Sequence, residues 1–193
     1  MKYRLYILFI SVGLLLIGCS SKSNFYQLYP KSAQNTNSTK STKGTVIGIA
    51  EVKVAEYLTK SAIVTRMDAS RVAIHETDLW AGSFAKNIQS VLTHNIASLL
   101  PRYTFLAYPW EEPIDDKYRI YITIDRFDGS QTGKVTLQGR WSVINKEENK
   151  VLYSESVNYT AQGGKTLGAI IDTQSKLLEQ LSRRIAAKVR TRI

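Results

Sequence analysis

One residue of this 193-residue chain stands out for its chemistry, the single cysteine Cys19. It follows a basic start at Lys2, a mostly apolar run over residues 5–17, and the small residue Gly18. A positive start, an apolar stretch and a small residue before the cleavage point are typical of a secretory signal. A cysteine thiolate is a strong nucleophile, so Cys19 is well suited to accept a group on its sulfur.

The end of the apolar run, Leu16-Ile17-Gly18-Cys19, resembles the lipobox of bacterial lipoproteins. The resemblance implies a diacylglyceryl group on the Cys19 sulfur, cleavage between Gly18 and Cys19, and a further acyl chain, such as palmitate, on the new amino end. Three chains exceed the two signals that stable anchoring needs. The apolar run is shorter than the ~20 residues that span a bilayer. Ser20 follows the cysteine, as in lipoproteins sent to the outer membrane, so we expect a lipid anchor there, facing the periplasm.

The charge balance is basic, with a formal net charge of +10 at neutral pH. A positive field favours anionic partners such as phospholipid or lipopolysaccharide head groups. No run of five or more basic residues occurs, so dispersed surface cations are the commoner explanation. A periplasmic address argues against a nucleic-acid partner. With its one thiol used for lipid, the body has no disulfide and must be held by a packed core.

Candidate catalytic groups are sparse. His75 and His94 have no second histidine or cysteine at metal-ligand spacing. Two carboxylate pairs, Glu111-Glu112 and Asp115-Asp116, lie close together, but prolines and Trp110 are interspersed among them. That mixture predicts a rigid exposed loop rather than a buried acid–base pair.

A glycine-containing stretch, Gly163-Gly164-Lys165-Thr166, superficially resembles a phosphate-binding loop. The full motif needs a glycine at position 159, where the chain has Tyr159. We therefore interpret this stretch as a turn and the start of a helix. Together with the sparse catalytic groups, this predicts no enzyme activity, no cofactor and no metal.

The three tryptophans differ in their surroundings. Trp80 and Trp141 fall on apolar faces, where core packing is expected. Trp110 lies in the loop Tyr108-Pro109-Trp110, where an aromatic side chain can anchor a partner or touch a membrane. Core packing remains an alternative for Trp110, but Tyr108 and Trp110 are the candidate partner interface.

The chain divides into three parts by composition. Residues 1–18 form the signal, 19–44 a lipid-anchored N-terminal segment with a flexible linker, and 45–193 the folded domain. Within the second part, residues 25–30 alternate as a short strand would, whereas residues 31–44 are almost wholly polar. A flexible coil of that length spans ~20 Å on average. We therefore expect the body to stand off the membrane on this linker.

Hydrophobic periodicity assigns the elements of the folded domain. A helix capped by Asp78, with Trp80 in its first turn, is expected to end at Pro101, and a second long helix is expected over 166–190. Strands are expected over residues 45–54, 62–66, 71–74, 104–108, 118–127, 134–144 and 151–160. This order predicts an α+β fold with a largely antiparallel sheet and two long helices packed on one face.

Short motifs then suggest a family. Glu56-Tyr57-Leu58 forms a turn before the strand Ile63-Val64-Thr65-Arg66, Phe25-Tyr26-Gln27-Leu28 follows the cysteine, and Leu79-Trp80 opens the first predicted helix. This order resembles the ABC-type transport auxiliary lipoprotein family, of the paraquat-inducible protein C type, a membrane integrity-associated transporter subunit. The resemblance covers nearly the whole mature chain. One departure is Val54-Ala55, where the family pattern leads us to expect a proline before the turn.

The resemblance implies a non-catalytic accessory subunit of an intermembrane lipid transport system. Its partners would be proteins with MCE domains and, in some relatives, an ABC permease and ATPase. Exposed strand edges also make a homo-oligomer plausible. Two other functions stay open at this point: a lipoprotein that activates a cell-wall synthase across the periplasm, and a shuttle that binds lipid directly.

Overall fold

The computed structural model describes residues 22–31, 45–111 and 113–193. Gly18, Cys19 and nearly all of the expected linker lie outside the described residues. The elements, in chain order, are β1 (Asn24–Tyr26), β2 (Val46–Ile49), β3 (Lys53–Val54), the 3-10 helix η1 (Glu56–Thr59), β4 (Ala62–Arg66), β5 (Val72–Trp80), α2 (Phe84–Leu99), β6 (Thr104–Ala107), β7 (Tyr118–Gly129), β8 (Lys134–Asn145), β9 (Lys150–Gln162) and α3 (Leu167–Arg192).

The larger sheet has the strand order β6-β2-β7-β8-β9, with β3 also paired to β7. Its long strands β7, β8 and β9 are antiparallel, as expected from strands joined by short turns. Strand β2 is parallel to both β6 and β7. Parallel strands need a long crossover connection, and the chain between β2 and β6 includes helix α2. The predicted α+β class is confirmed, although the sheet is mixed rather than purely antiparallel.

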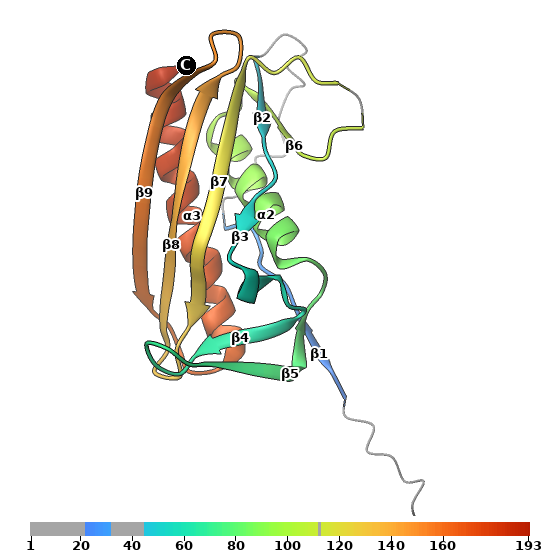
Figure 1. The fold of residues 1–193 in the computed structure, drawn as a ribbon, viewed down its shortest axis with the longest axis vertical. Coiled ribbons are helices and arrows are strands. Elements are labelled where there is room, and N and C mark those ends of the chain that lie inside the picture. Colours follow the sequence, from blue (N-terminus) through green and yellow to red (C-terminus); the bar gives the residue numbers. More distant parts are fainter. Residues whose placement is uncertain (1–21, 32–44, 112) are drawn as a thin grey trace, which may run out of the picture.

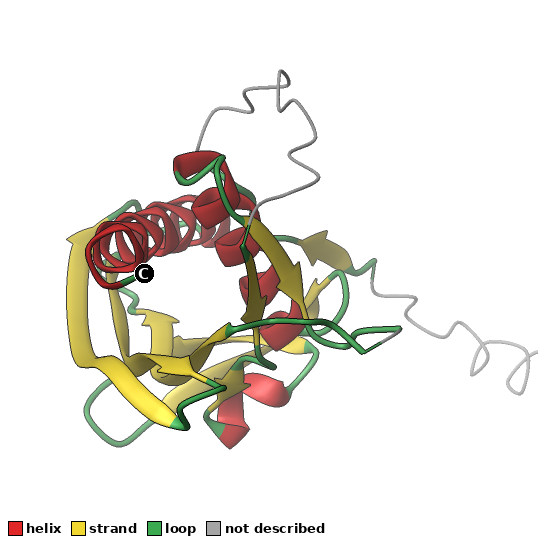
Figure 2. Ribbon diagram, turned by 90° about the horizontal axis from the view of Figure 1, so that it is seen from above, coloured by secondary structure: helices red, strands yellow, loops and turns green. Residues whose placement is uncertain are grey.

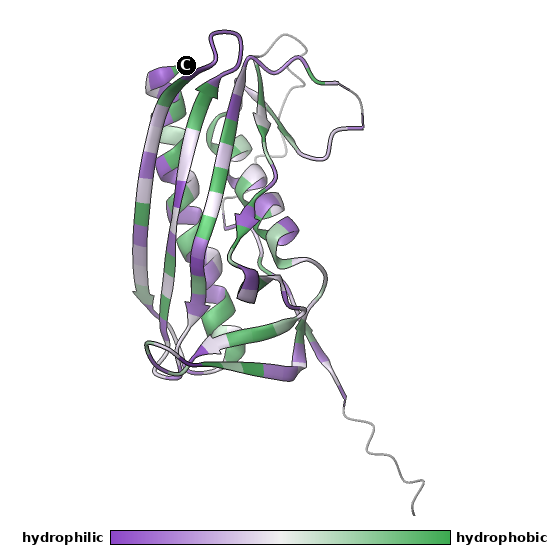
Figure 3. Ribbon diagram, viewed as in Figure 1, coloured by the Kyte–Doolittle hydropathy of each residue, from purple (hydrophilic) through white to green (hydrophobic). Residues whose placement is uncertain are grey.

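Both helices lie on the same side of this sheet (Figures 1 and 2). Figure 3 shows hydrophobic and hydrophilic residues alternating along β7 and β8, as a half-buried strand requires. The inward side chains of the sheet meet the apolar stripe of α3 in one core, and members such as Ile120, Leu137, Leu178 and Ile185 are completely buried. The predicted packing of two long helices on one face is therefore confirmed.

The first helix begins later than expected. Asp78 and Trp80 lie in strand β5, and α2 begins at Phe84, with the Ser83 hydroxyl accepting a hydrogen bond from the backbone N–H of Lys86. The apolar residues near position 80 fit either periodicity, but pairing with β1 extends the strand through Trp80. The prediction that Asp78 caps this helix and that Trp80 opens it is therefore wrong.

The strand expected over residues 45–54 is divided into β2 and β3. Ile49 pairs with Ile120 and Lys53 pairs with Thr123. The segment that joins β2 to β3 therefore holds one residue more than the stretch of β7 opposite it. An extra residue of this kind bends a strand locally. The bend leads directly into η1 and the start of the smaller sheet.

The smaller sheet has the order β1-β5-β4 and includes the N-terminal strand, parallel to β5. The side-chain amide of Asn24 donates to the Asp78 carboxylate at 2.9 Å, and the Tyr26 hydroxyl donates to the same oxygen at 3.1 Å. The predicted short N-terminal strand is present, but it covers Asn24–Tyr26 rather than residues 25–30. We call residues 24–31 the N-terminal strap.

Beyond β1 the strap stays attached to the two helices. Leu28 is 1% exposed, and its backbone exchanges hydrogen bonds with the side-chain amide of Asn87 on α2, at 2.7 and 3.2 Å. Lys31 pairs with Asp172 on α3 at 2.6 Å. The chain between Lys31 and Thr45 therefore connects two fixed points of the body. Contrary to expectation, it cannot hold the body away from an anchor at Cys19, because the strap precedes it.

Candidate functional site

A buried carboxylate, Asp128 on β7, is surrounded by family-motif residues. Its side chain is fully buried and accepts hydrogen bonds from the Tyr57 hydroxyl at 2.8 Å and the Arg66 guanidinium at 2.9 Å. Arg126 donates to its second oxygen at 3.0 Å. These four residues, the Asp128 cluster, join η1 and the end of β4 to the larger sheet.

The electrostatics of the cluster favour the neutral form of its tyrosine. Burial raises the pKa of Tyr57 to about 12, and its hydrogen bond to Asp128 adds to the rise. The hydrogen bond to Asp128 likewise raises the pKa of Arg66. A buried carboxylate is tolerated only when it is paired and hydrogen-bonded, and here it is. The cluster is therefore a structural junction between η1, β4 and the larger sheet.

The other motif residues have ordinary packing roles. Glu56 is exposed at the start of η1, whereas Leu58, Ile63, Val64 and Thr65 are buried. Trp80, 7% exposed, stacks on Phe84 with ring centroids 4.2 Å apart, and the prediction that it lies in the core is confirmed. Trp141 is also in the core, at 2% exposure.

The missing proline before the turn has a physical explanation. Ala55 has a φ of −57°, which a proline ring would accept. However, the backbone N–H of Ala55 donates to the carbonyl of Ile124 at 2.9 Å, and a proline has no N–H to donate. The turn closes without it, through a hydrogen bond from the Leu58 N–H to the Ala55 carbonyl.

The predicted partner residues form a preorganised tip after β6. The Tyr108 ring is 45% exposed and meets the half-buried Trp110 ring edge-on, with centroids 5.3 Å apart. The Arg119 guanidinium lies 4.3 Å from the centre of the Trp110 ring. We call Tyr108, Pro109 and Trp110 the Trp110 tip. It presents one aromatic ring to solvent on a support that is already ordered.

Asp116 holds the base of this tip in place. Arg119 donates to both of its oxygens at 2.7 and 2.9 Å, and Lys146 donates at 2.5 Å. Burial alone would raise the pKa of Asp116, but the hydrogen bonds from Arg119 and Lys146 outweigh it and the pKa lies below its ordinary value. The expectation that this carboxylate sits in an exposed loop is wrong for Asp116 and correct for Asp115, which is exposed.

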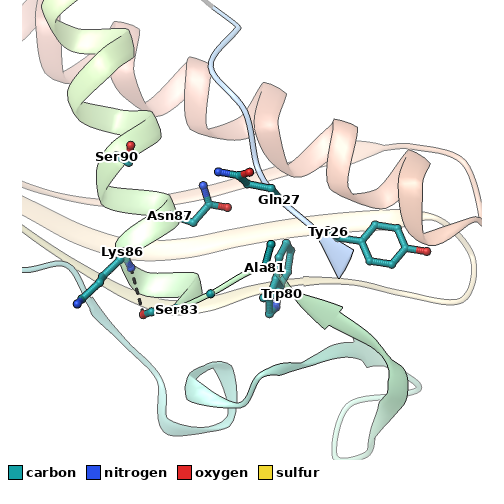
Figure 4. A pocket seen from close by; sticks show the side chains of 9 residues that line it. Tyr26, Gln27, Trp80, Ala81, Ser83, Lys86, Asn87 and Ser90 are labelled. Atoms are coloured by element: carbon teal, nitrogen blue, oxygen red, sulfur yellow. Dashed lines mark hydrogen bonds between the residues drawn. The ribbon is translucent and has the colours of Figure 1, made fainter. Parts of the chain in front are cut away.

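Two hollows line the outer side of α2. The first, of about 270 Å³, lies between the N-terminal strap and the start of the helix. Figure 4 shows Gln27 from the strap and Asn87 from α2 extending into the same space. The second, of about 420 Å³, reaches Tyr108 and Pro109. The hollows share Lys86 and Ser90, so we treat them as one α2 groove that ends at the Trp110 tip.

Sequence reasoning missed the α2 groove. Its strap and tip walls are more than eighty positions apart in the chain, and no local pattern links them. One available signal was the polar side of the helix, where Lys86, Ser90 and Thr93 recur at steps of three and four.

Within the described ranges, no three His, Cys, Asp or Glu residues gather as a metal site would require. The His75 ring shares a hydrogen bond of 2.9 Å with the Thr65 hydroxyl, and His94 lies in the wall of the α2 groove. Among the residues whose placement is described, no helix combines the length and apolar character needed to span a bilayer.

Comparisons with known proteins agree with this arrangement. This chain is similar to a protein named "Intermembrane transport lipoprotein PqiC" from Escherichia coli (strain K12). The two are 29% identical over 132 residues, which cover 67% of this chain and 68% of the relative. The protein of the same name from Shigella flexneri matches equally well. A crystal structure of protein XCC0632 from Xanthomonas campestris shares the fold, with a TM-score of 0.67 and 12% identity over 84% of this chain and 92% of that one.

A second crystal structure, of an uncharacterized protein, gives a TM-score of 0.73 at 17% identity, over 88% of this chain and 99% of that chain. The model of one family, described as the ABC-type transport auxiliary lipoprotein component, matches residues 26–186. That range includes the Asp128 cluster, the α2 groove and the Trp110 tip. The chain belongs to the family of ABC-type transport auxiliary lipoprotein components.

Proposed function

We propose that this protein is anchored in the outer membrane by acyl chains on Cys19 and acts in the periplasm as a non-catalytic accessory subunit of an intermembrane lipid transport system. Its partners in this proposal are MCE-domain proteins, with or without an ABC permease and ATPase. Family membership and the similarity to two proteins named intermembrane transport lipoprotein support the transport role. The lipobox-like sequence supports the anchor.

The observation that carries the proposal is the separation of two ends of the molecule. The strap that follows Cys19 lies at one end of the long strands, and the segment between β6 and β7, which contains the Trp110 tip, lies toward the other (Figure 1). Strand β8, whose twelve residues run between these ends, is ~40 Å long. An anchor at the strap therefore points the Trp110 tip away from the membrane, toward periplasmic partners.

The chemistry of the tip suits protein recognition. Exposed tyrosines are enriched at interface positions that contribute much of the binding energy. The Tyr108 ring packs against Trp110, and Trp110 in turn packs against Arg119. Because these side chains are already in contact, binding a partner orders few additional groups. The α2 groove continues from this ring along the helix and offers a partner a longer surface.

The test is crosslinking in cells with a photoreactive amino acid at position 108. A matched control is position 121, because Tyr121 is 41% exposed and Tyr108 is 45% exposed. Tyr121 projects from β7 on the face away from the helices, since its neighbours Ile120 and Ile122 are buried in the core. We expect adducts with an MCE-domain protein from position 108 and not from position 121.

Position 108 is preferred to position 110 because the Trp110 ring supports Arg119, and its replacement would disturb folding as well as docking. Adducts with a cell-wall synthase from position 108 would favour that alternative function. Equal adducts from both positions, or none from position 108, would contradict the Trp110 tip as the interface.

A further inference from the structure

The distance between the lipid-bearing residue and the folded body is short. Five peptide steps separate Cys19 from Asn24, the first residue of β1. Even a fully extended chain covers only ~17 Å in five steps. Because the strap is fastened to β5, α2 and α3, this reach limits the whole body. The end of the molecule beside the strap must therefore lie close to the bilayer that holds the acyl chains.

Three turns meet at this end of the molecule. Arg66, before the β4–β5 turn, bridges to Ser130 in the β7–β8 turn. Gly163, after β9, donates a hydrogen bond of 2.8 Å to the carbonyl of Gly133 in that same turn. Figure 1 shows β4 and β5 lying across the lower end of β7, β8 and β9. We call the β1-β5-β4 sheet together with turns 67–71, 130–133 and 163–166 the basal end.

The basal end includes exposed apolar and exposed cationic side chains. Phe25 is 66% exposed, Met67 is 45% exposed and Ile74 is 48% exposed. Lysines flank the turns, and Lys134 and Lys165 are both exposed. Apolar residues that insert among head groups, with lysines that meet phosphates, are the composition of a membrane-surface contact.

Acidic residues also lie at this end, and one of them is paired with a cation. Asp68 is paired with Arg71 at 2.6 Å, and Asp78 accepts the hydrogen bonds of the strap. Glu76 is exposed and opposes the lysines. Glu76 and Asp78 both lie in β5, whereas Lys134 and Lys165 lie at the turns, so the turns carry the cationic side chains that an anionic surface attracts.

We propose that the basal end rests on the anionic phospholipid head groups of the leaflet that holds the acyl chains, with Phe25 and Met67 among the head groups and Lys134 and Lys165 against phosphates. This inference rests on the proposed lipidation of Cys19. A protein partner is the less suitable occupant, because a tether of ~17 Å leaves little room for a folded domain between this end and the bilayer.

The test uses the full acylated protein in vesicles of phosphatidylethanolamine and phosphatidylglycerol. A Met67→Cys variant receives a fluorophore, and Glu147→Cys, in the β8–β9 turn at the far end, is the matched control. The acylated Cys19 sulfur is a thioether and does not react with the label. Lipids that carry a quencher on the head group should quench the label at position 67 several-fold more than the label at position 147.

Charge reversal separates head-group attraction from simple tethering. The change Lys165→Glu should lower quenching at position 67, and the effect should be absent in vesicles of phosphatidylcholine alone. Lys150→Glu, an exposed lysine at the opposite end of β9, should leave it unchanged. If Lys165→Glu has no effect, or if Lys150→Glu has the same effect, the assignment of the basal lysines to phosphates is overturned.

Mass spectrometry of the same preparations separates this inference from the proposed function. If the protein carries acyl chains on Cys19 and both labels are quenched equally, the basal contact is wrong and the proposed transport role is unaffected. If Cys19 carries no lipid, the proposed anchor itself fails.

Discussion

At the scale of single residues, the Asp128 cluster is the most demanding arrangement in the molecule. A carboxylate with 0% side-chain exposure is balanced by two arginines and a tyrosine from three separate elements. Removing one member of a buried pair leaves the other charges without compensation, which costs more than the pair contributes. The cluster is therefore where small chemical changes should have large effects on stability.

We predict that Asp128→Asn lowers the free energy of unfolding by about 3 kcal/mol, because Arg66 and Arg126 lose their carboxylate while the shape is kept. Chemical denaturation measures the change. Asp125→Asn is the control, since the Asp125 side chain is 56% exposed and lies 3.5 Å from Arg140, so we expect a loss below ~0.5 kcal/mol. Equal losses in the two variants would mean that Asp128 is not a junction.

The raised pKa of Tyr57 predicts that the stability of the protein depends on pH in the alkaline range. Its pKa is raised to about 12 in the folded protein, against 10.0 ordinarily, so between these values the folded state binds more protons than the unfolded state. The stabilisation by the neutral hydroxyl is complete below pH 10 and is lost as the pH rises toward 12. Tyr57→Phe should be less stable at neutral pH by ~1 kcal/mol and should lose this part of the alkaline decline.

The comparison must be made as a difference between Tyr57→Phe and the unchanged protein at each pH, because lysines also titrate in this range. Urea denaturation between pH 8 and about 11 supplies it. Parallel curves for the two proteins would show that the Tyr57 hydroxyl does not titrate with a raised pKa.

At the scale of elements, the start of α2 is set by Ser83 rather than by Asp78. We predict that Ser83→Ala lowers the free energy of unfolding by about 1 kcal/mol, because the hydroxyl accepts the Lys86 N–H and satisfies an otherwise free donor. Asp78→Ala should instead loosen β1, whose Asn24 and Tyr26 both donate to that carboxylate.

Hydrogen exchange distinguishes the two changes by position. The first variant should lose protection at the amides of the first turn of α2, and the second at the amides of β1 and the paired half of β5. Loss of protection in the first turn of α2 in the Asp78→Ala variant alone would instead show that Asp78 caps the helix.

Local pattern was sufficient for the elements that have one clear periodicity. The long strands alternate cleanly because one face packs on the helices, and α3 carries an apolar stripe along its whole length, so both were predicted close to their observed bounds. Pattern failed around residue 80, where Leu79 and Trp80 suit a strand or a helix and the choice depends on β1, more than fifty residues away.

The candidate site, too, was predictable from the sequence only in part. Tyr108 and Trp110 were singled out because they flank a proline in a predicted loop, and their role as a partner interface stays a prediction. The burial of Asp116 could not be foreseen, since one of its partners, Lys146, comes from a turn thirty residues away. The lipidated position stays a prediction, because Cys19 lies outside the described residues.

At the scale of the whole molecule, the N-terminal strap makes residues 24–31 part of the folded body. We predict that Leu28→Ala lowers the free energy of unfolding by ~2–5 kcal/mol, because its 1% exposed side chain leaves a cavity in the core. Val151→Ala, at a residue that is 57% exposed, should cost less than ~0.5 kcal/mol. Chemical denaturation of both variants measures this, and a small loss for Leu28→Ala would mean that the strap is only loosely attached.

In the proposed anchored state, the three-residue strand β1, which begins five residues after Cys19, would also determine how the protein responds to mechanical load. In that state, tension between the bilayer and a docked partner would enter through β1, which pairs with β5 over three residues, whereas β8 and β9 pair along nearly their whole length. Once the strap is pulled free, residues 24–45 add a reach of ~75 Å. The molecule would then extend at the strap while its core and the Trp110 tip remain folded.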